Sequence, residues 1–244
     1  MALTSHAADA AARFDRLDAL RALAILWMAA FHFCFDLNHY KLIHQNFYND
    51  PVWTVQRAVI VSLFLFCAGF GQAVAWEQGQ GWLRFWRRWA QVLGCALLVT
   101  AGSYLMFPSS YISFGVLHGI ALMLIITRLT ANAGVWLWPL GLAAVLAPQL
   151  VQSSFFDTRL TNWVGLITHK PITEDYAPLL PWIGVMWWGL AAGQWVLKHR
   201  REWVTGALPG ALQPAAMLGR WSLSFYMLHQ PVLIGLLLAV RALQ

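Results

Sequence analysis

Charged residues are scarce in this sequence, and that scarcity excludes an ordinary soluble domain. They make up 11% of the 244 residues, against roughly 25% in a typical soluble domain. Hydrophobic residues make up 59%, and the apolar runs extend along the whole length, so no soluble domain of useful size fits between them. We therefore predict a single integral membrane domain over residues 1–244.

Sequence motifs for several common chemistries are missing as well. There is no glycine-rich phosphate loop with its lysine, no Cys-x-x-Cys, no His-Glu-x-x-His and no Gly-x-Ser-x-Gly. ATP hydrolysis, hydride transfer and serine-hydrolase chemistry therefore have no support. The three cysteines, Cys34, Cys67 and Cys95, each lie within an apolar run, so we expect small core residues and neither a disulfide framework nor a metal site.

A cleavable signal peptide and an internal repeat are two further absences. Residues 1–18 are polar, and the first apolar run continues into a full span without a small-residue cleavage site. The lack of a repeat counts against small transporters built from duplicated halves. The net charge is +6, but the basic residues lie in short loops beside helix ends, so membrane topology explains them and no nucleic-acid partner is expected.

Long apolar segments are abundant, and about 20 such residues suffice to cross a membrane. The candidates are residues 19–38, 54–76, 88–106, 113–129, 133–150, 178–197 and 217–240. Most Lys and Arg residues fall on one side of this arrangement, which by the positive-inside rule is the cytoplasm. The predicted fold is an all-α bundle of about seven transmembrane helices, with the N-terminus inside and the C-terminus outside.

Three of the predicted spans contain a histidine: His32, His118 and His229. An ionisable group at the membrane centre costs roughly 2.5–3.5 kcal/mol on insertion scales, so those that are retained usually face a polar cavity or one another. The predicted depths of the three histidines are compatible with one shared pocket.

His32 and Asp36 are four residues apart, which places both side chains on one face of the first helix. A carboxylate bonded to one ring nitrogen would leave the other nitrogen as a base, so the pair is a candidate catalytic dyad. The alternative is that Asp36 pairs with Arg57 at the headgroup boundary and His32 bonds a backbone carbonyl.

The last predicted span carries a polar stripe with Tyr226 three residues before His229. A pocket-lining role and a structural kink at Pro231 are both open for this stripe. His118 is flanked by Gly115 and Gly119, for which close helix packing is the simpler explanation.

A cluster of arginines is predicted at the cytoplasmic ends of the helices. It contains Arg21, Arg84, Arg87 and Arg88, together with Arg128. Guanidinium groups bind phosphate oxygens in a bidentate manner, so the cluster suits a phosphate-rich ligand. Topology and contact with anionic lipid are the alternative for most of these residues.

Five stretches, taken in order, resemble a known family of membrane enzymes. They are RLDALRALAILWMAAFHF (16–33), SLFLFCAGFG (62–71), FGVLHGIAL (114–122), DYAPLLPWIGVMWWG (175–189) and LGRWSLSFYMLHQPVLIG (218–235). Together they are similar to the bacterial relatives of heparan-alpha-glucosaminide N-acetyltransferase, a family of transmembrane acyltransferases. The resemblance covers most of the chain, although Ala22 stands where a glycine is usual.

This resemblance implies acetyl transfer across a membrane, here the bacterial inner (cytoplasmic) membrane. Acetyl-CoA would donate from the cytoplasm, with its phosphates at the arginine cluster, to a hydroxyl or amine of a sugar or glycoconjugate on the outer side. His32 would be the base or a transient acetyl carrier. His118, His229, Tyr226, Asp175 and Tyr176 would contact the acceptor, and no metal is needed.

The same resemblance introduces a rival for His32. The lysosomal branch has asparagine at that position and places its reactive histidine in the following loop, which makes His44, or less well His39, the alternative. A haem-binding electron-transfer protein with two intramembrane histidines as axial ligands is a second hypothesis, and a transporter without chemistry is a third. The acceptor, the existence of an acetyl-histidine intermediate and assembly into homo-oligomers stay open.

Overall fold

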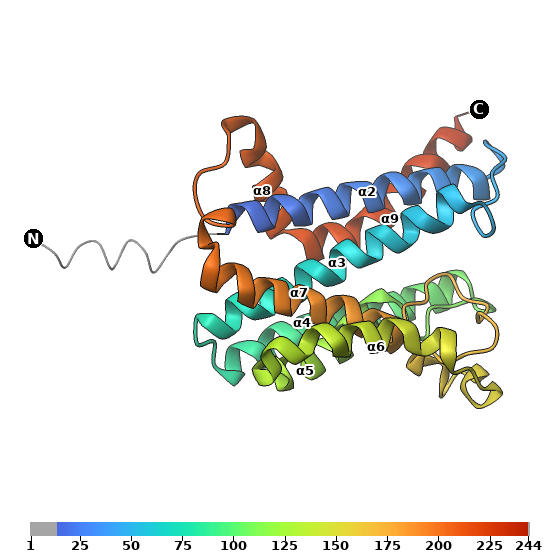
Figure 1. The fold of residues 1–244 in the computed structure, drawn as a ribbon. Helices are drawn as coiled ribbons and strands as arrows, with labels where there is room; N and C mark the ends of the chain where they lie inside the picture. Colours follow the sequence, from blue (N-terminus) through green and yellow to red (C-terminus); the bar gives the residue numbers. More distant parts are fainter. Residues whose placement is uncertain (1–13, 244) are drawn as a thin grey trace, which may run out of the picture. The chain divides into compact units, whose positions relative to one another are not determined.

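The computed structural model describes residues 14–243, and this part of the chain contains helices and loops but no β-strand. The α-helices are α2 (Asp15–His39), α3 (Pro51–Glu77), α4 (Trp82–Met106), α5 (Val116–Leu129), α6 (Leu137–Leu150), α7 (Leu179–His199), α8 (Gln213–Arg220) and α9 (Ser222–Ala242) (Figure 1). Short 3₁₀ helices are η1 (Ala131–Trp136), η2 (Ser154–Asp157), η3 (Asn162–Val164), η4 (Arg201–Trp203) and η5 (Gly210–Leu212). The all-α prediction is confirmed.

Each predicted span coincides with a helix, but only some of these helices are both long and apolar enough to cross a membrane alone. Five segments meet that condition: Asp15–His39, Pro51–Glu77, Trp82–Met106, Ala131–Leu150 and Ser222–Val240. Helix α5 has 14 residues, about 21 Å at 1.5 Å per residue, which is shorter than a hydrocarbon core of about 30 Å. Helix α7 is also outside these five segments. An integral membrane protein is supported, whereas seven spans and their orientation remain predictions.

The last predicted span, 217–240, is divided in the structure. Helix α8 ends at Arg220, and α9 begins at Ser222 after a break at Trp221. Polar residues and a proline at the start of α8 allow a short amphipathic helix. A hydropathy pattern cannot show such a break, because the apolar residues on both sides of it form one run.

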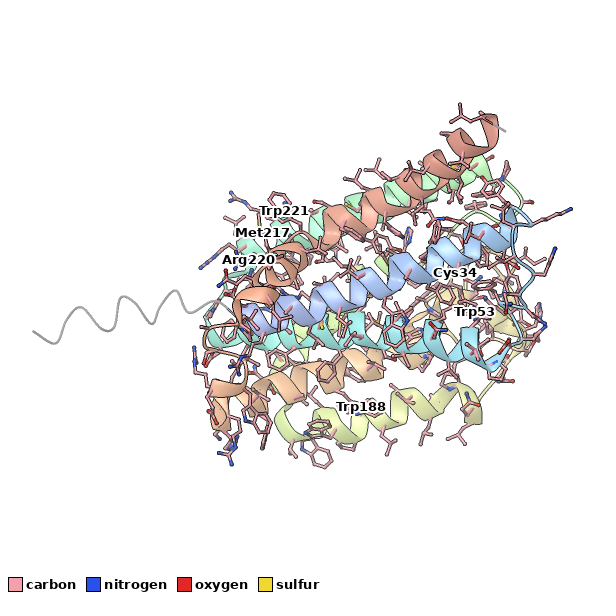
Figure 2. All side chains as sticks on the ribbon, turned by 90° about the horizontal axis from the view of Figure 1, so that it is seen from above. Cys34, Trp53, Trp188, Met217, Arg220 and Trp221 are labelled. Atoms are coloured by element: carbon pink, nitrogen blue, oxygen red, sulfur yellow. The ribbon has the colours of Figure 1, made fainter. Side chains whose placement is uncertain are left out.

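The chain forms two compact units, each of which is described by itself. The first unit comprises Met1–Ile60 and Trp195–Gln244, and in it α2 packs along α8 and α9 (Figure 1). A side chain at Gly219 would meet the backbone oxygen of Asp18 at 1.7 Å, so glycine permits this close approach. Figure 2 shows Arg220 and Met217 near the N-terminal end of α2, whereas Cys34 lies toward its C-terminal end.

The second unit, Val61–Gln194, is held by an apolar core. The buried members of that core are Leu65, Met123, Ala144, Ile183 and Met186. Glycines bring α3 and α7 together around it, because a Cβ atom at Gly69 or Gly189 would lie 2.0 or 2.2 Å from a carbonyl oxygen of the facing helix. Small residues at a helix contact are typical of membrane proteins.

Candidate active site

Two of the predicted histidines meet where α2 packs against α9 in the first unit. The ring centroids of His32 and His229 are 5.2 Å apart, with the rings tilted by 59°. His229 is buried and His32 is half-buried. The Nδ1 atom of His229 lies 2.7 Å from the carbonyl oxygen of Tyr226. The structure therefore brings these two histidines together, while their roles stay predictions.

The carboxylate of Asp36, one turn beyond His32 on α2, is engaged by α9. Gln230 Nε2 donates to both of its oxygens, at 2.8 and 3.0 Å, and the Asp36 side chain is buried. Within residues 14–243, neither the expected hydrogen bond from His32 to Asp36 nor the alternative pairing of Asp36 with Arg57 is present. His32, Asp36, His229 and Gln230 together form what we call the α2–α9 polar cluster.

His44, the rival catalytic histidine, lies exposed in the loop after α2. Phe47 fixes this loop: it is 2% exposed and stacks on Trp53 with ring centroids 4.0 Å apart. His39, the weaker rival, is exposed in the last turn of α2. The choice between His32 and the loop histidines therefore remains a matter for experiment.

Arg21 is occupied by ion pairs at the start of α2. Its Nη1 atom lies 2.6 Å from Asp18 Oδ1, and Arg220 contacts Asp15 at 2.8 Å and Asp18 at 3.8 Å. Two of the stretches that resemble the acyltransferase family, one on α2 and one spanning α8 and α9, thus meet at this ion-pair network. Because Asp18 already neutralises Arg21, the Arg21 guanidinium is less suited to binding a phosphate than the sequence suggested.

The other predicted phosphate-binding arginines lie at the start of α4. Arg84, Arg87 and Arg88 are all exposed, and Arg88 donates to Gln91 at 3.4 Å. Their exposure suits either a soluble phosphate ligand or lipid headgroups.

Arg128 behaves differently from these exposed arginines, because it is buried at the end of α5. It donates to the carbonyl oxygen of Gln80, and its guanidinium carbon lies 5.0 Å from the centroid of the Trp76 ring and 5.5 Å from that of Trp82. Cation–π contacts of this kind stabilise a desolvated guanidinium. Arg128 therefore ties α5 to the α3–α4 turn.

His118 belongs to the second unit, where both of its ring nitrogens are used. Thr100 Oγ1 donates to the Ile112 carbonyl at 2.8 Å, so it accepts from His118 Nε2 at 3.1 Å. His118 Nδ1 accepts from the Gly115 N–H at 3.3 Å. These bonds define one neutral tautomer and close the start of α5. Participation of His118 in an acceptor pocket stays a prediction.

Asp175 and Tyr176 also have partners within the second unit. Asp175 Oδ2 accepts from the Val116 N–H at 2.6 Å, which caps α5, and the Tyr176 hydroxyl donates to the Asn162 carbonyl at 2.7 Å. Burial raises the pKa of Tyr176, and the negative charge of Asp157 adds to this shift. Tyr176 is thus a permanent hydrogen-bond donor, and its contact with an acceptor remains a prediction.

Gln230 is the site residue that sequence reasoning missed. It follows His229 directly within a span, and a second polar side chain at such a position is itself a signal of a polar contact inside the membrane. Thr100, the partner of His118, was missed because a single threonine in an apolar helix does not by itself indicate a polar site. Neither partner can be assigned before the neighbouring helix is known.

Comparison with known protein families identifies a match over most of the chain. The family model described as "Heparan-alpha-glucosaminide N-acetyltransferase, catalytic" matches residues 13–231, which is most of the chain and includes α2, α9 up to Pro231 and everything between them. Comparison with curated proteins gave no match, and neither did comparison with solved structures. The family match and the apolar helices show that the chain belongs to the heparan-alpha-glucosaminide N-acetyltransferase family of membrane acyltransferases.

Proposed function

We propose that this protein moves an acetyl group from cytoplasmic acetyl-CoA to a hydroxyl or amine of a sugar or glycoconjugate on the outer side of a bacterial inner membrane. The observation that carries the proposal is the meeting of His32 and His229, with ring centroids 5.2 Å apart, inside a chain of this acetyltransferase family. An imidazole in such a place can take a proton from the acceptor as it attacks the thioester.

In this proposal His32 is the base, the role that the sequence predicts for it, and His229 is its neighbour on α9. Arg84, Arg87 and Arg88 would meet the phosphates of acetyl-CoA, and Arg21 would contribute less because Asp18 neutralises it. Phosphate binding by exposed guanidinium groups needs no rearrangement of the fold. His118, Tyr226, Asp175 and Tyr176 remain candidates for contact with the acceptor.

The test is release of free thiol from acetyl-CoA by purified protein supplied with candidate sugars. We expect His32→Ala to lower turnover by about 10²-fold or more, the usual contribution of a general base, without changing the elution profile of the protein. Loss of turnover in His44→Ala with normal turnover in His32→Ala would transfer the role to the loop after α2. No thiol release by the unaltered protein with any acceptor would contradict the proposal.

The haem hypothesis drawn from the sequence is the second candidate, but the observed pair does not favour it, because 5.2 Å between the ring centroids is too short for an iron and its porphyrin plane between the two imidazoles. The visible spectrum of freshly purified protein distinguishes the two functions. A Soret band that disappears in both His32→Ala and His229→Ala would favour haem binding over acetyl transfer.

A further inference from the structure

The hydrogen bond of His229 defines which of its nitrogens carries the proton. The Tyr226 carbonyl, 2.7 Å from Nδ1, can only accept, so Nδ1 carries the hydrogen. The neutral ring then has a lone pair on Nε2. That atom is buried and has no hydrogen-bond partner among residues 14–243. His229 is thus a buried acceptor with a fixed tautomer and an unused lone pair.

His32 is the ring beside this acceptor. The ring centroids are 5.2 Å apart, a separation at which nitrogens that face each other lie at a hydrogen-bond distance of about 3 Å. Neither ring nitrogen of His32 has a hydrogen bond within the described part of the chain. His229 Nε2 lacks a hydrogen-bond donor, and the N–H of the neutral His32 ring lacks a hydrogen-bond acceptor. The two rings are therefore complementary.

The carboxylate expected to orient His32 is committed elsewhere. Both oxygens of Asp36 accept from Gln230 Nε2. His39, another titratable residue in this part of α2, is exposed and lies in the last turn of the helix. Two buried acceptor atoms of the α2–α9 polar cluster have no partner among residues 14–243, His229 Nε2 and Gln230 Oε1, and of these two residues it is His229 whose ring contacts His32.

We propose that His229 is the positioning residue of His32. Its Nε2 accepts a hydrogen bond from the N–H of His32. This bond orients the other His32 nitrogen as a base toward the sugar or glycoconjugate that receives the acetyl group. This inference rests on the proposed acetyl transfer. It assigns to an imidazole the part that a carboxylate plays in a Ser-His-Asp triad, which is to hold one tautomer and support the charged ring.

The transfer then balances without a further reactant. The acceptor oxygen or nitrogen forms a bond to the acetyl carbon while its proton moves to the free nitrogen of His32. The carbon–sulfur bond breaks, and the departing thiolate of CoA takes that proton, which restores neutral His32. During this step Nε2 of His229 stabilises the positive charge on the His32 ring through their shared hydrogen bond.

The discriminating pair of variants is His229→Phe and His229→Gln. Phenylalanine keeps a ring that can stack on Phe225, whose ring is nearly parallel to that of His229 at 6.2 Å, but it has no acceptor. We expect His229→Phe to lower kcat about 100-fold with little change in KM for acetyl-CoA, as for loss of a group that acts only in the transition state. Glutamine offers an oxygen acceptor and should recover activity to within about tenfold of the unaltered protein.

The matched control is His199→Phe. His199 is exposed at the end of α7, and its Nδ1 contacts the Trp195 carbonyl at 3.0 Å, so it makes the same kind of local bond as His229. We expect its replacement to leave kcat unchanged. Normal kcat in His229→Phe, or an equal loss in folded His229→Phe and His229→Gln, would overturn the proposal.

A second measurement separates this inference from the proposed function itself. Nitrogen-15 spectra of histidine-labelled protein report which ring nitrogen carries hydrogen. We expect one defined tautomer for His32 in the unaltered protein and in His199→Phe, and a mixture of both tautomers in His229→Phe. If thiol release fails but this change appears, acetyl transfer is wrong and the pairing stands. If the His32 tautomer does not respond to His229→Phe, the pairing is wrong whatever the activity.

Discussion

The contact that holds α2 to α9 in the first unit differs in kind from the contact that holds α3 to α7 in the second. In the first unit, polar groups cross between helices: Gln230 holds Asp36, Trp27 donates to Gln56 at 3.1 Å, and Arg220 pairs with Asp15. In the second unit, α3 and α7 meet through glycines around an apolar core.

This difference separates the supporting part of the protein from the part suited to chemistry. Apolar close packing costs no desolvation of polar groups and leaves nothing reactive behind. Polar contacts inside a membrane are expensive to form and are usually retained where function requires them. In the second unit, His118 and Asp175 serve the start of α5, and Arg128 ties its end to the α3–α4 turn. The first unit is therefore where reactive side chains are expected.

The largest effect on stability should come from filling the glycine contact of the second unit. A Cβ atom at Gly189 would lie 2.2 Å from the Phe66 oxygen, so Gly189→Ala forces α3 and α7 apart. We expect the free energy of unfolding to fall by about 3 kcal/mol, measured by thermal unfolding in detergent. Gly94→Ala in α4, where a Cβ would meet nothing within 4 Å, is the control and should not destabilise. Equal melting temperatures for Gly189→Ala and Gly94→Ala would show that close packing at Gly189 does not hold α3 to α7.

An intermediate effect is expected at the polar contact of the first unit. Gln230→Leu leaves the buried Asp36 carboxylate without its donor, so the double-mutant cycle with Asp36→Leu should give a coupling energy of about 1–2 kcal/mol. Chemical unfolding of the four proteins in detergent measures it. Gln56 bonds Trp27 rather than Asp36, so a cycle of Gln56→Leu with Asp36→Leu should show no coupling. A coupling energy near zero in the first cycle would mean that the polar contact does not hold α2 to α9.

The smallest effect concerns the loop before α7. Hydrogen bonds from Thr168 hold the pKa of Asp157 below its usual value, and the bond from the Thr168 hydroxyl has the largest effect. Because the pKa of Asp157 is lower in the folded state, its ionisation stabilises the fold at pH values above its ordinary pKa of about 3.9. This stabilisation is lost as the pH falls through the folded-state pKa. Thr168→Val should therefore reduce thermal stability slightly at pH 7 and flatten its decline in acid.

The control for this loop is Thr173→Val. Its hydroxyl donates to the Tyr111 carbonyl at 3.0 Å, a group that does not titrate, so any loss of stability should be equal at pH 7 and below pH 4. Identical acid profiles for Thr168→Val and the unaltered protein would show that Asp157 has no such role.

Hydropathy was sufficient to predict the positions of the longer helices, because each of them contains an apolar run that backbone hydrogen bonding turns into a helix in lipid. Hydropathy did not predict the break between α8 and α9 at Trp221, because a change in the direction of the chain does not alter the sequence of apolar residues. The pattern predicted a short fourth span, 113–129, and the helix begins three residues later, at Val116.

The candidate site was predictable in its residues and not in its contacts. His32 and His229 stand out because imidazole in lipid is unusual, and their predicted depths agreed. The i and i+4 spacing of His32 and Asp36 correctly places them one turn apart on a helix. It does not reveal that Asp36 contacts Gln230, because a partner 194 positions away depends on the rotation and crossing of two helices.

Arg128 has a consequence for how the chain matures. In the predicted topology, where α5 is one of the spans, the Arg128 guanidinium counts toward the charge imbalance by which a nascent helix is oriented. Once the aromatic rings of Trp76 and Trp82 and the Gln80 carbonyl surround it, that cation is hidden from lipid and water. Reversing the helix would then require the protein to break those contacts and rehydrate the charge, so the contacts of the folded protein oppose any change of the predicted orientation.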